Sequence, residues 1–237
     1  MRTSCQWNHL PKVFGDDSSV HRWFQRSRRR RRLREALGDT CGGMRRTRRR
    51  RLGVAGGRRL PRQGPLGGRN PTDRGRQGTK KSVVVERDGG PLGVTIAGAN
   101  VHPEGRDLRR SGRPGDTKML AETLDAIVVE RPQPTDEAPQ NLSLDEAFDN
   151  PTGREATESR EYVPHIRRIG EEKPDENRRK RHPARRWVVE RTISWLETCR
   201  AILVRDDANA QNCLGLLRLA CALLWFRRLF RLANMRL

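Results

Sequence analysis

Residues 83–97 read VVVERDGGPLGVTIA, and this stretch decides the fold. Two runs rich in β-branched residues, 83–86 and 92–97, flank the sequence DGG at residues 88–90. A turn signal between two apolar runs predicts a β-hairpin, because glycine readily adopts the positive φ angles of tight hairpin turns. We therefore expect two antiparallel strands at this point of the chain.

Helix and strand signals follow this hairpin toward the C-terminus. Apolar residues recur at helical spacing in residues 117–129, 185–203 and 212–233, whereas residues 142–144 and 162–169 are short runs typical of strands. The predicted order is hairpin, helix, strand, strand, helix, helix. This order predicts an α/β domain in which helices pack on a mixed sheet.

Positive charge is concentrated in the first third of the chain. Residues 1–81 hold 24 Lys+Arg and 5 Asp+Glu, a net charge of +19; the whole chain holds 50 and 29, so residues 82–237 hold 26 and 24, a net charge of +2. The total of +21 indicates a polyanionic partner, most commonly a nucleic acid. The nearly balanced remainder is typical of an ordinary globular domain.

An arginine block interrupts the N-terminal part of the chain. Residues 26–62 contain 16 arginines, no lysine, many glycines and few apolar residues. Such a composition cannot bury a core, so we expect a disordered segment over residues 27–66. This segment is either a nucleic-acid-binding arm or a frameshifted stretch of an ordinary domain, and we favour the frameshift.

A short helix is expected just before this block. Residues 16–19 supply polar groups that can cap a helix carrying Val20, Trp23 and Phe24 on one face. We interpret residues 1–26 as the remnant of a helix-turn-helix region, in which Arg22 and Arg26 would face DNA. A lone solvated helix is the alternative.

The apolar content bears on membrane association. Hydrophobic residues make up 33% of the chain and the mean hydropathy is −0.89, which suggests that much of the chain lies outside any core. The longest apolar run, residues 219–226, is far shorter than the ~18 residues of a membrane span. We expect no membrane partner and a cytoplasmic location.

Six strings in the second part of the chain carry a family resemblance. They occur in one order and cover most of residues 65–237: NPTDRGRQGTK (70–80), PLGVTIAGANVH (91–102), TLDAIVVERP (123–132), LDEAFDNPTGRE (144–155), PHIRRIGEEK (164–173) and RHPARRWVVERTISWL (181–196). In these strings the chain resembles the DDE transposases of the insertion-sequence-five type. Several long strings in order are more specific than one short motif.

The resemblance implies a ribonuclease-H-like catalytic domain over residues 67–237. In such a domain three carboxylates hold two divalent cations, Mg²⁺ or Mn²⁺, because hard oxygen ligands select these ions. The implied reaction is hydrolysis of a phosphodiester at the transposon end, followed by attack of the released 3′-hydroxyl on target DNA. The implied partners are therefore the transposon ends and the target, and a homo-oligomer is compatible with this chemistry.

Two of the three carboxylates have matching positions. Asp145, at the end of a predicted strand, matches the second metal-binding acid, with Asp149 as a local rival. Glu190 matches the third, and Arg186, one helical turn earlier, would contact DNA. The family's Tyr-x2-Arg-x3-Glu-x6-Lys signature is otherwise not kept, since Pro183 and Glu197 stand at its outer positions.

The first aspartate is missing from its expected strand. The family pattern there resembles WQAADG, whereas residues 53–63 read GVAGGRRLPRQ. This segment can be reverse-translated with freely chosen codons and then read in a frame shifted by one nucleotide. The shifted frame encodes Glu-Trp-Gln-Ala-Ala-Asp-Gly, and its aspartate codon spans the codons of Arg58 and Arg59. We therefore expect a sheet without its first strand and a transposase that is inactive as encoded; the alternative is a non-catalytic, basic nucleic-acid-binding protein.

Overall fold

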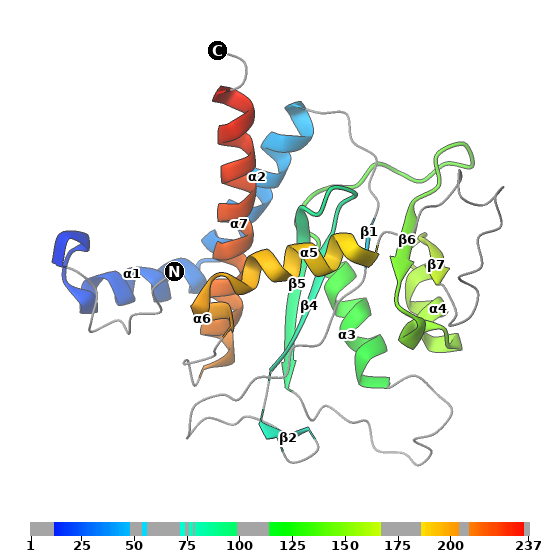
Figure 1. Cartoon of the computed structure of the whole chain (residues 1–237), viewed down its shortest axis with the longest axis horizontal. Helices are drawn as coiled ribbons and strands as arrows, with labels where there is room; N and C mark the ends of the chain where they lie inside the picture. The colour runs from blue at the N-terminus through cyan, green and yellow to red at the C-terminus, as the bar shows by residue number, and fades with distance from the viewer. Residues whose placement is uncertain are drawn as a thin grey trace.

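The computed structural model describes residues 12–47, 54–55, 72–73, 76–77, 79–98, 114–166, 186–203 and 209–234. These residues form a five-stranded mixed sheet surrounded by helices (Figure 1), which confirms the predicted α/β class. Residues 48–53 and 56–66 of the expected disordered segment, Arg58 and Arg59 among them, lie outside the described residues.

The predicted hairpin is confirmed. Strands β4 (Thr79–Val85) and β5 (Pro91–Gly98) are antiparallel, with Val83 paired to Val94. The turn between them contains Gly89 at φ 86°, a left-handed conformation that glycine adopts without steric cost. β4 is buried at every residue, which is the burial expected of a strand covered on both faces.

The strand order is β5-β4-β1-β6-β7. Central strand β1 (Val54–Ala55) is antiparallel to β4 and parallel to β6 (Asn141–Leu144), and β6 is parallel to β7 (Val163–Ile166). The expectation that the first strand is missing was therefore wrong. Val54 and Ala55 occupy its place and supply the backbone pairing between β4 and β6.

A second, two-stranded sheet pairs β2 (Thr72–Asp73) with β3 (Arg76–Gln77). The helices after the hairpin are α3 (Pro114–Asp125), α4 (Pro151–Glu158), α5 (Arg186–Glu197), α6 (Arg200–Leu203) and α7 (Ala210–Asn234), with a single 3-10 turn, η3 (Glu146–Phe148), before α4. The helix predicted over residues 185–203 is divided between α5 and α6, and α4 is not among the predicted elements.

The N-terminal third differs most from expectation. After a 3-10 turn, η2 (Lys12–Phe14), it forms α1 (Asp17–Arg29) and α2 (Arg32–Thr47), so the predicted disorder was wrong for residues 27–47. The reason is an apolar stripe, Leu33, Leu37 and Cys41, which is buried and belongs to the same core as the sheet.

Glycines permit α1 and α2 to approach the rest of the chain closely. A β-carbon on Gly215 of α7 would meet Phe24 of α1 at 3.2 Å and Leu33 of α2 at 3.3 Å. A β-carbon on Gly38 would meet the Val128 backbone oxygen at 3.3 Å. The N-terminal helices are thus packed against α7 and the segment after α3, and α1 is not a lone solvated helix.

The hairpin turn is held between α5 and α7. Thr192 Oγ1 donates a hydrogen bond to the Gly89 carbonyl at 2.6 Å, and Trp225 Nε1 donates to the Pro91 carbonyl at 2.7 Å. A β-carbon on Gly90 would lie 2.0 Å from the Trp225 ring, so only glycine fits there.

Within the described part, no helix is both long enough and apolar enough to cross a membrane.

Candidate functional site

Asp145 lies at the end of β6. β6 is flanked by β1 and β7, both parallel to it, and the pairing of Ala55 with Ser143 brings the end of β1 alongside the residues just before Asp145. The Asp145 carbonyl accepts a hydrogen bond from the Phe148 amide at 3.0 Å, which turns the chain away from the sheet. The half-buried aspartate therefore occupies the edge where neighbouring parallel strands end.

The nearby acid Asp149 has a different environment. Arg154 donates to Asp149 Oδ1 from NH2 at 2.6 Å and from Nε at 3.0 Å, and the Asp149 side chain is 11% exposed. Asn150 caps α4 by accepting from the Gly153 amide at 2.8 Å. This local network gives Asp149 a structural role in the turn that leads into α4.

Glu190 lies on α5, whose buried face comprises Val188, Val189, Thr192, Ile193 and Leu196. α5 contacts β4 and β1, and its N-terminal end lies beside β1 (Figure 1). Glu190 is half-buried in this N-terminal half. Arg186 is the first residue of α5, and its side chain lies outside the described residues. Asp145 and Glu190 thus come from two elements that both adjoin β1.

The two other predicted DNA-contacting residues lie elsewhere. Arg22 and Arg26 are exposed on α1, on the opposite side of the molecule from β6 (Figure 1). Arg22 donates from Nε to the Ser18 carbonyl at 3.3 Å. The neighbouring Gln25 instead donates to Asn212 of α7 at 3.0 Å, which fixes α1 against that helix. The structure therefore does not bring Arg22 and Arg26 together with Asp145.

An aromatic and arginine stack next to Glu190 is not among the predicted features. The Arg191 guanidinium lies 4.6 Å from the Trp187 ring centroid and 4.9 Å from that of Trp195, and both rings are exposed. Arg191 also donates to the Asp88 carbonyl at 2.8 Å. The spacing Trp-x3-Arg-x3-Trp was the signal, since residues four apart share a helix face.

Two carboxylates alone do not meet the requirement of a two-metal centre. The described residues contain no group of three His, Cys, Asp or Glu side chains that could hold a metal ion. Asp145 and Glu190 are the two carboxylates that the family resemblance assigned to such a centre.

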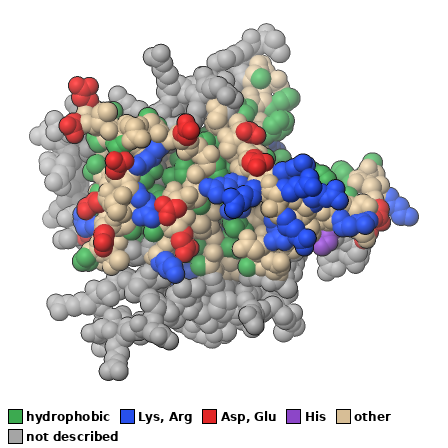
Figure 2. Space-filling view, turned by 180° about the vertical axis from the view of Figure 1, so that it is seen from behind, with side chains coloured by type: hydrophobic (Ala, Val, Ile, Leu, Met, Phe, Trp, Pro, Cys, Tyr) green, Lys and Arg blue, Asp and Glu red, His purple; other side chains and the backbone are tan. Residues whose placement is uncertain are grey.

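A basic surface covers the N-terminal helices. Residues 18–34 contain eight arginines and no acidic residue. Figure 2 shows Lys and Arg side chains gathered over the part of the molecule that carries α1 and α2. Six of these arginines are exposed: Arg22, Arg26, Arg29, Arg30, Arg31 and Arg32. This surface is separate from the strand end that carries Asp145.

Comparison with known proteins identifies the class of protein. Neither a protein-family profile nor a solved structure matches the chain significantly. A protein from Burkholderia cepacia, named as a transposase for insertion sequence element IS402, is 32% identical over 174 residues, which are 70% of this chain and 72% of that protein. The chain belongs to the insertion-sequence transposases.

Proposed function

We propose that this chain is a transposase of the DDE type with a ribonuclease-H-like catalytic domain. In this proposal Asp145 and Glu190 supply two of the three acids that hold Mg²⁺ or Mn²⁺ and Arg186 contacts DNA. The observation that carries it is the central position of β1, with Asp145 following the neighbouring parallel strand and Glu190 on a helix that contacts β1. The first acid of the triad is expected at the end of that central strand.

The proposed reaction acts on DNA. Water attacks a phosphodiester at the element's end, and the bond from phosphorus to the 3′ oxygen breaks. The released 3′-hydroxyl then attacks a target phosphodiester, and the 3′ oxygen of the target strand leaves. Two divalent cations would supply stabilisation of the attacking and leaving oxygens when bound. Within this chain, Asp145 and Glu190 supply oxygen donors from two different elements, which fits hard cations of this kind.

We propose further that the chain is inactive as encoded. The sequence has Arg58 and Arg59, and no acid, at the place where the resemblance implies the first metal-binding aspartate. In contrast, α2 packs well in the encoded frame, so any alteration that harms function is expected after Thr47.

The test compares two chains in the same assay. One is the encoded protein, and the other has residues 53–63 re-read one nucleotide along, so that an aspartate follows β1 while α1 and α2 stay unchanged. Both are incubated with terminal-repeat duplexes and Mg²⁺ or Mn²⁺. Cleavage by the re-read chain alone supports the proposal. Cleavage by the encoded chain that survives Asp145→Ala contradicts both the site and the inactivity.

A non-catalytic, basic nucleic-acid-binding protein is the second candidate function. The eight arginines of residues 18–34 favour it, because an arginine-rich surface binds the phosphate backbone without reading sequence. DNA binding by both chains without cleavage by either would support this alternative. Assembly as a homo-oligomer and a cytoplasmic location stay predictions.

A further inference from the structure

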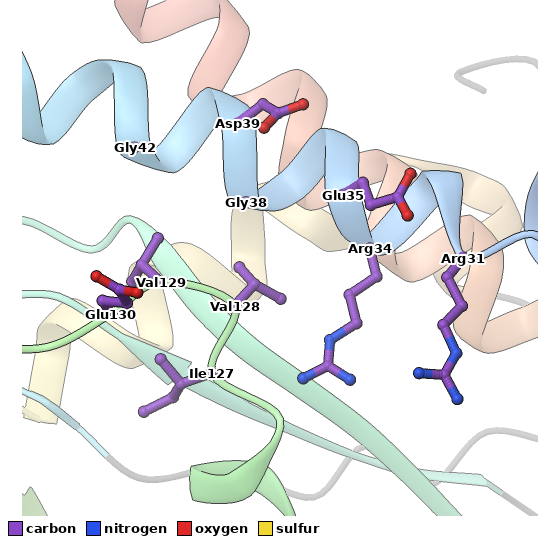
Figure 3. A pocket seen from close by; sticks show the side chains of 10 residues that line it. All are labelled: Arg31, Arg34, Glu35, Gly38, Asp39, Gly42, Ile127, Val128, Val129 and Glu130. Carbon is purple, nitrogen blue, oxygen red and sulfur yellow. The ribbon is translucent and has the colours of Figure 1, made fainter.

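A groove separates α2 from the segment that follows α3. It has a volume of about 770 Å³ and is lined by Arg31, Arg34, Glu35, Gly38, Asp39, Gly42 and residues 127–130. Figure 3 shows the Arg31 and Arg34 side chains extending in the same direction from the N-terminal end of α2, whereas the carboxylates of Glu35 and Asp39 are directed to the other side. The two guanidinium groups therefore form one positively charged end of the groove.

A third arginine adds to this charge from α7. Burial, and then the charges of Arg34 and Arg31, lower the pKa of the half-buried Arg218. Within the described part of the chain, none of these three arginines pairs with a carboxylate. Like charges held together without a counter-charge destabilise the fold, so an anion bound among them would relieve the repulsion.

The backbone at Arg31 is also unusual. Arg31 has φ 57°, in the left-handed region, at the junction between α1 and α2. Glycine or asparagine occupies such junctions at lower steric cost. Arg31 directly precedes α2, and its carbonyl accepts hydrogen bonds from the Arg34 and Glu35 amides. The arginine thus stands at the N-terminal end of this helix, where the helix dipole favours an anion.

We propose that Arg31 and Arg34, together with Arg218 of the adjoining helix α7, bind phosphate groups of a DNA backbone at the N-terminal end of α2. Guanidinium groups match the geometry of phosphate oxygens and cannot lose their charge at neutral pH, which makes arginine clusters suited to this ligand. The site lies apart from Asp145 and Glu190. The inference rests on the proposed function only because it takes DNA as the partner. The exposed arginines of α1 extend the same surface.

The acidic residues of the groove limit where the phosphate can lie. Glu35, Asp39 and Glu130 line the same groove as the two arginines. Their carboxylates repel a phosphodiester, so the backbone is expected to pass over the Arg31 end and not along the full groove. Contacts to phosphate alone carry no sequence information, so this site should bind duplexes of any sequence.

The experiment measures duplex binding against salt concentration. The cluster variant carries Arg31→Gln, Arg34→Gln and Arg218→Gln; the matched control carries Arg87→Gln, Arg227→Gln and Arg231→Gln, three exposed arginines, so both lose the same charge. Each neutralised phosphate contributes about 0.9 to the slope of log K against log salt. The cluster variant should lose about 2 to 3 units of slope and at least about tenfold in affinity, and the control clearly less.

Folding is checked with the same proteins and with Arg31→Gly. Removal of charge from the cluster should keep or raise the thermal midpoint at low salt, because repulsion is relieved. Arg31→Gly should raise it by about 2–4 °C through loss of the left-handed strain, while it weakens DNA binding. A more stable protein that binds DNA less well cannot be explained by damage to the fold.

Three outcomes would overturn the inference. Equal losses in cluster and control variants would mean that only net charge matters. If the unmodified chain did not bind the duplex, DNA could not be the ligand of this cluster. Inorganic phosphate that binds the unmodified chain but not the cluster variant, with the duplex affinity the same for both, would assign the site to small phosphates. Cleavage assays on the re-read chain, run in parallel, separate the two proposals. A re-read chain that binds DNA through the cluster but does not cleave it contradicts only the catalytic proposal.

Discussion

Ala55 of β1 pairs with Ser143 of β6 in parallel register, two residues before Asp145. This pairing places the end of the central strand beside the edge of the sheet that carries the predicted metal-binding aspartate. α5, which carries Glu190, contacts β1 as well. Asp145 and Glu190, the two acids of the proposed site, therefore come from elements that both adjoin β1.

In the re-read chain, Asp145→Asn should abolish strand cleavage while Asp149→Asn should not. Loss of a metal-binding carboxylate removes several kcal/mol of transition-state stabilisation, about a thousandfold in rate or more. Asp149 is a matched control, since its carboxylate is engaged by Arg154. Its substitution should mainly lower thermal stability. Loss of cleavage in Asp149→Asn alone would move the catalytic assignment to Asp149.

The N-terminal helices should be integral to the folded protein. Leu37 is 1% exposed and lies in the common core, so Leu37→Ala should reduce the free energy of unfolding by about 2–5 kcal/mol. Leu223, at 42% exposure, is the control, and its substitution by alanine should cost about 0.5 kcal/mol or less. Denaturant titration measures both. Rapid proteolysis within residues 17–47, with Leu37→Ala as stable as the control, would show that these helices do not share the core.

The sequence predicted those elements whose signals are local. The turn glycines and β-branched runs of β4 and β5, and the helical periodicity of α7, required no knowledge of distant residues. α2 escaped prediction because its apolar stripe is embedded among arginines and gains its stability from α7 and Gly215. β1 escaped because a two-residue strand has no periodicity and is defined by its neighbours.

The candidate site also contains both features with local sequence signals and features that depend on distant residues. Asp145 and Glu190 were assigned by resemblance, and their elements could be predicted from local patterns. The groove beside α2 could not be predicted, since it depends on residues far apart in sequence, Arg34 and Val128, meeting through the close approach of Gly38. Charge composition indicated a polyanionic partner but did not indicate which arginines lie without a counter-charge.

An exposed ion pair should make a small, pH-dependent contribution to stability. Arg160 donates to both carboxylate oxygens of Asp125 at 2.7 Å, and this hydrogen bonding holds the pKa of Asp125 below its usual value. A carboxyl group whose pKa is lowered by folding stabilises the protein above its unfolded pKa, and the stabilisation is lost as pH falls through the folded pKa.

Asp125→Asn should therefore lower stability near neutral pH by about 0.2–1 kcal/mol, because the Asp125 side chain is 61% exposed and solvent screens the pair. The difference from the unmodified protein should shrink in high salt and disappear in strong acid. Urea titrations across pH measure it. A difference that grows as the pH falls would contradict the sign of this linkage.

The hairpin turn should tolerate no side chain at Gly90. A β-carbon there would lie 2.0 Å from Trp225, whose ring is 2% exposed and held by its hydrogen bond to the Pro91 carbonyl. Gly90→Ala must therefore displace either the ring or the turn, and it should destabilise the protein by about 1–3 kcal/mol or more.

Gly42→Ala is the matched control for this substitution. Gly42 lies within α2, and a β-carbon there would meet no heavy atom within 4 Å. Since alanine favours helices over glycine by up to about 1 kcal/mol, this change should stabilise the protein. The same chemical change is thus expected to have opposite signs at the two positions. Denaturant unfolding followed by tryptophan fluorescence measures both, and equal effects would mean that Trp225 does not pack against the turn as the structure describes.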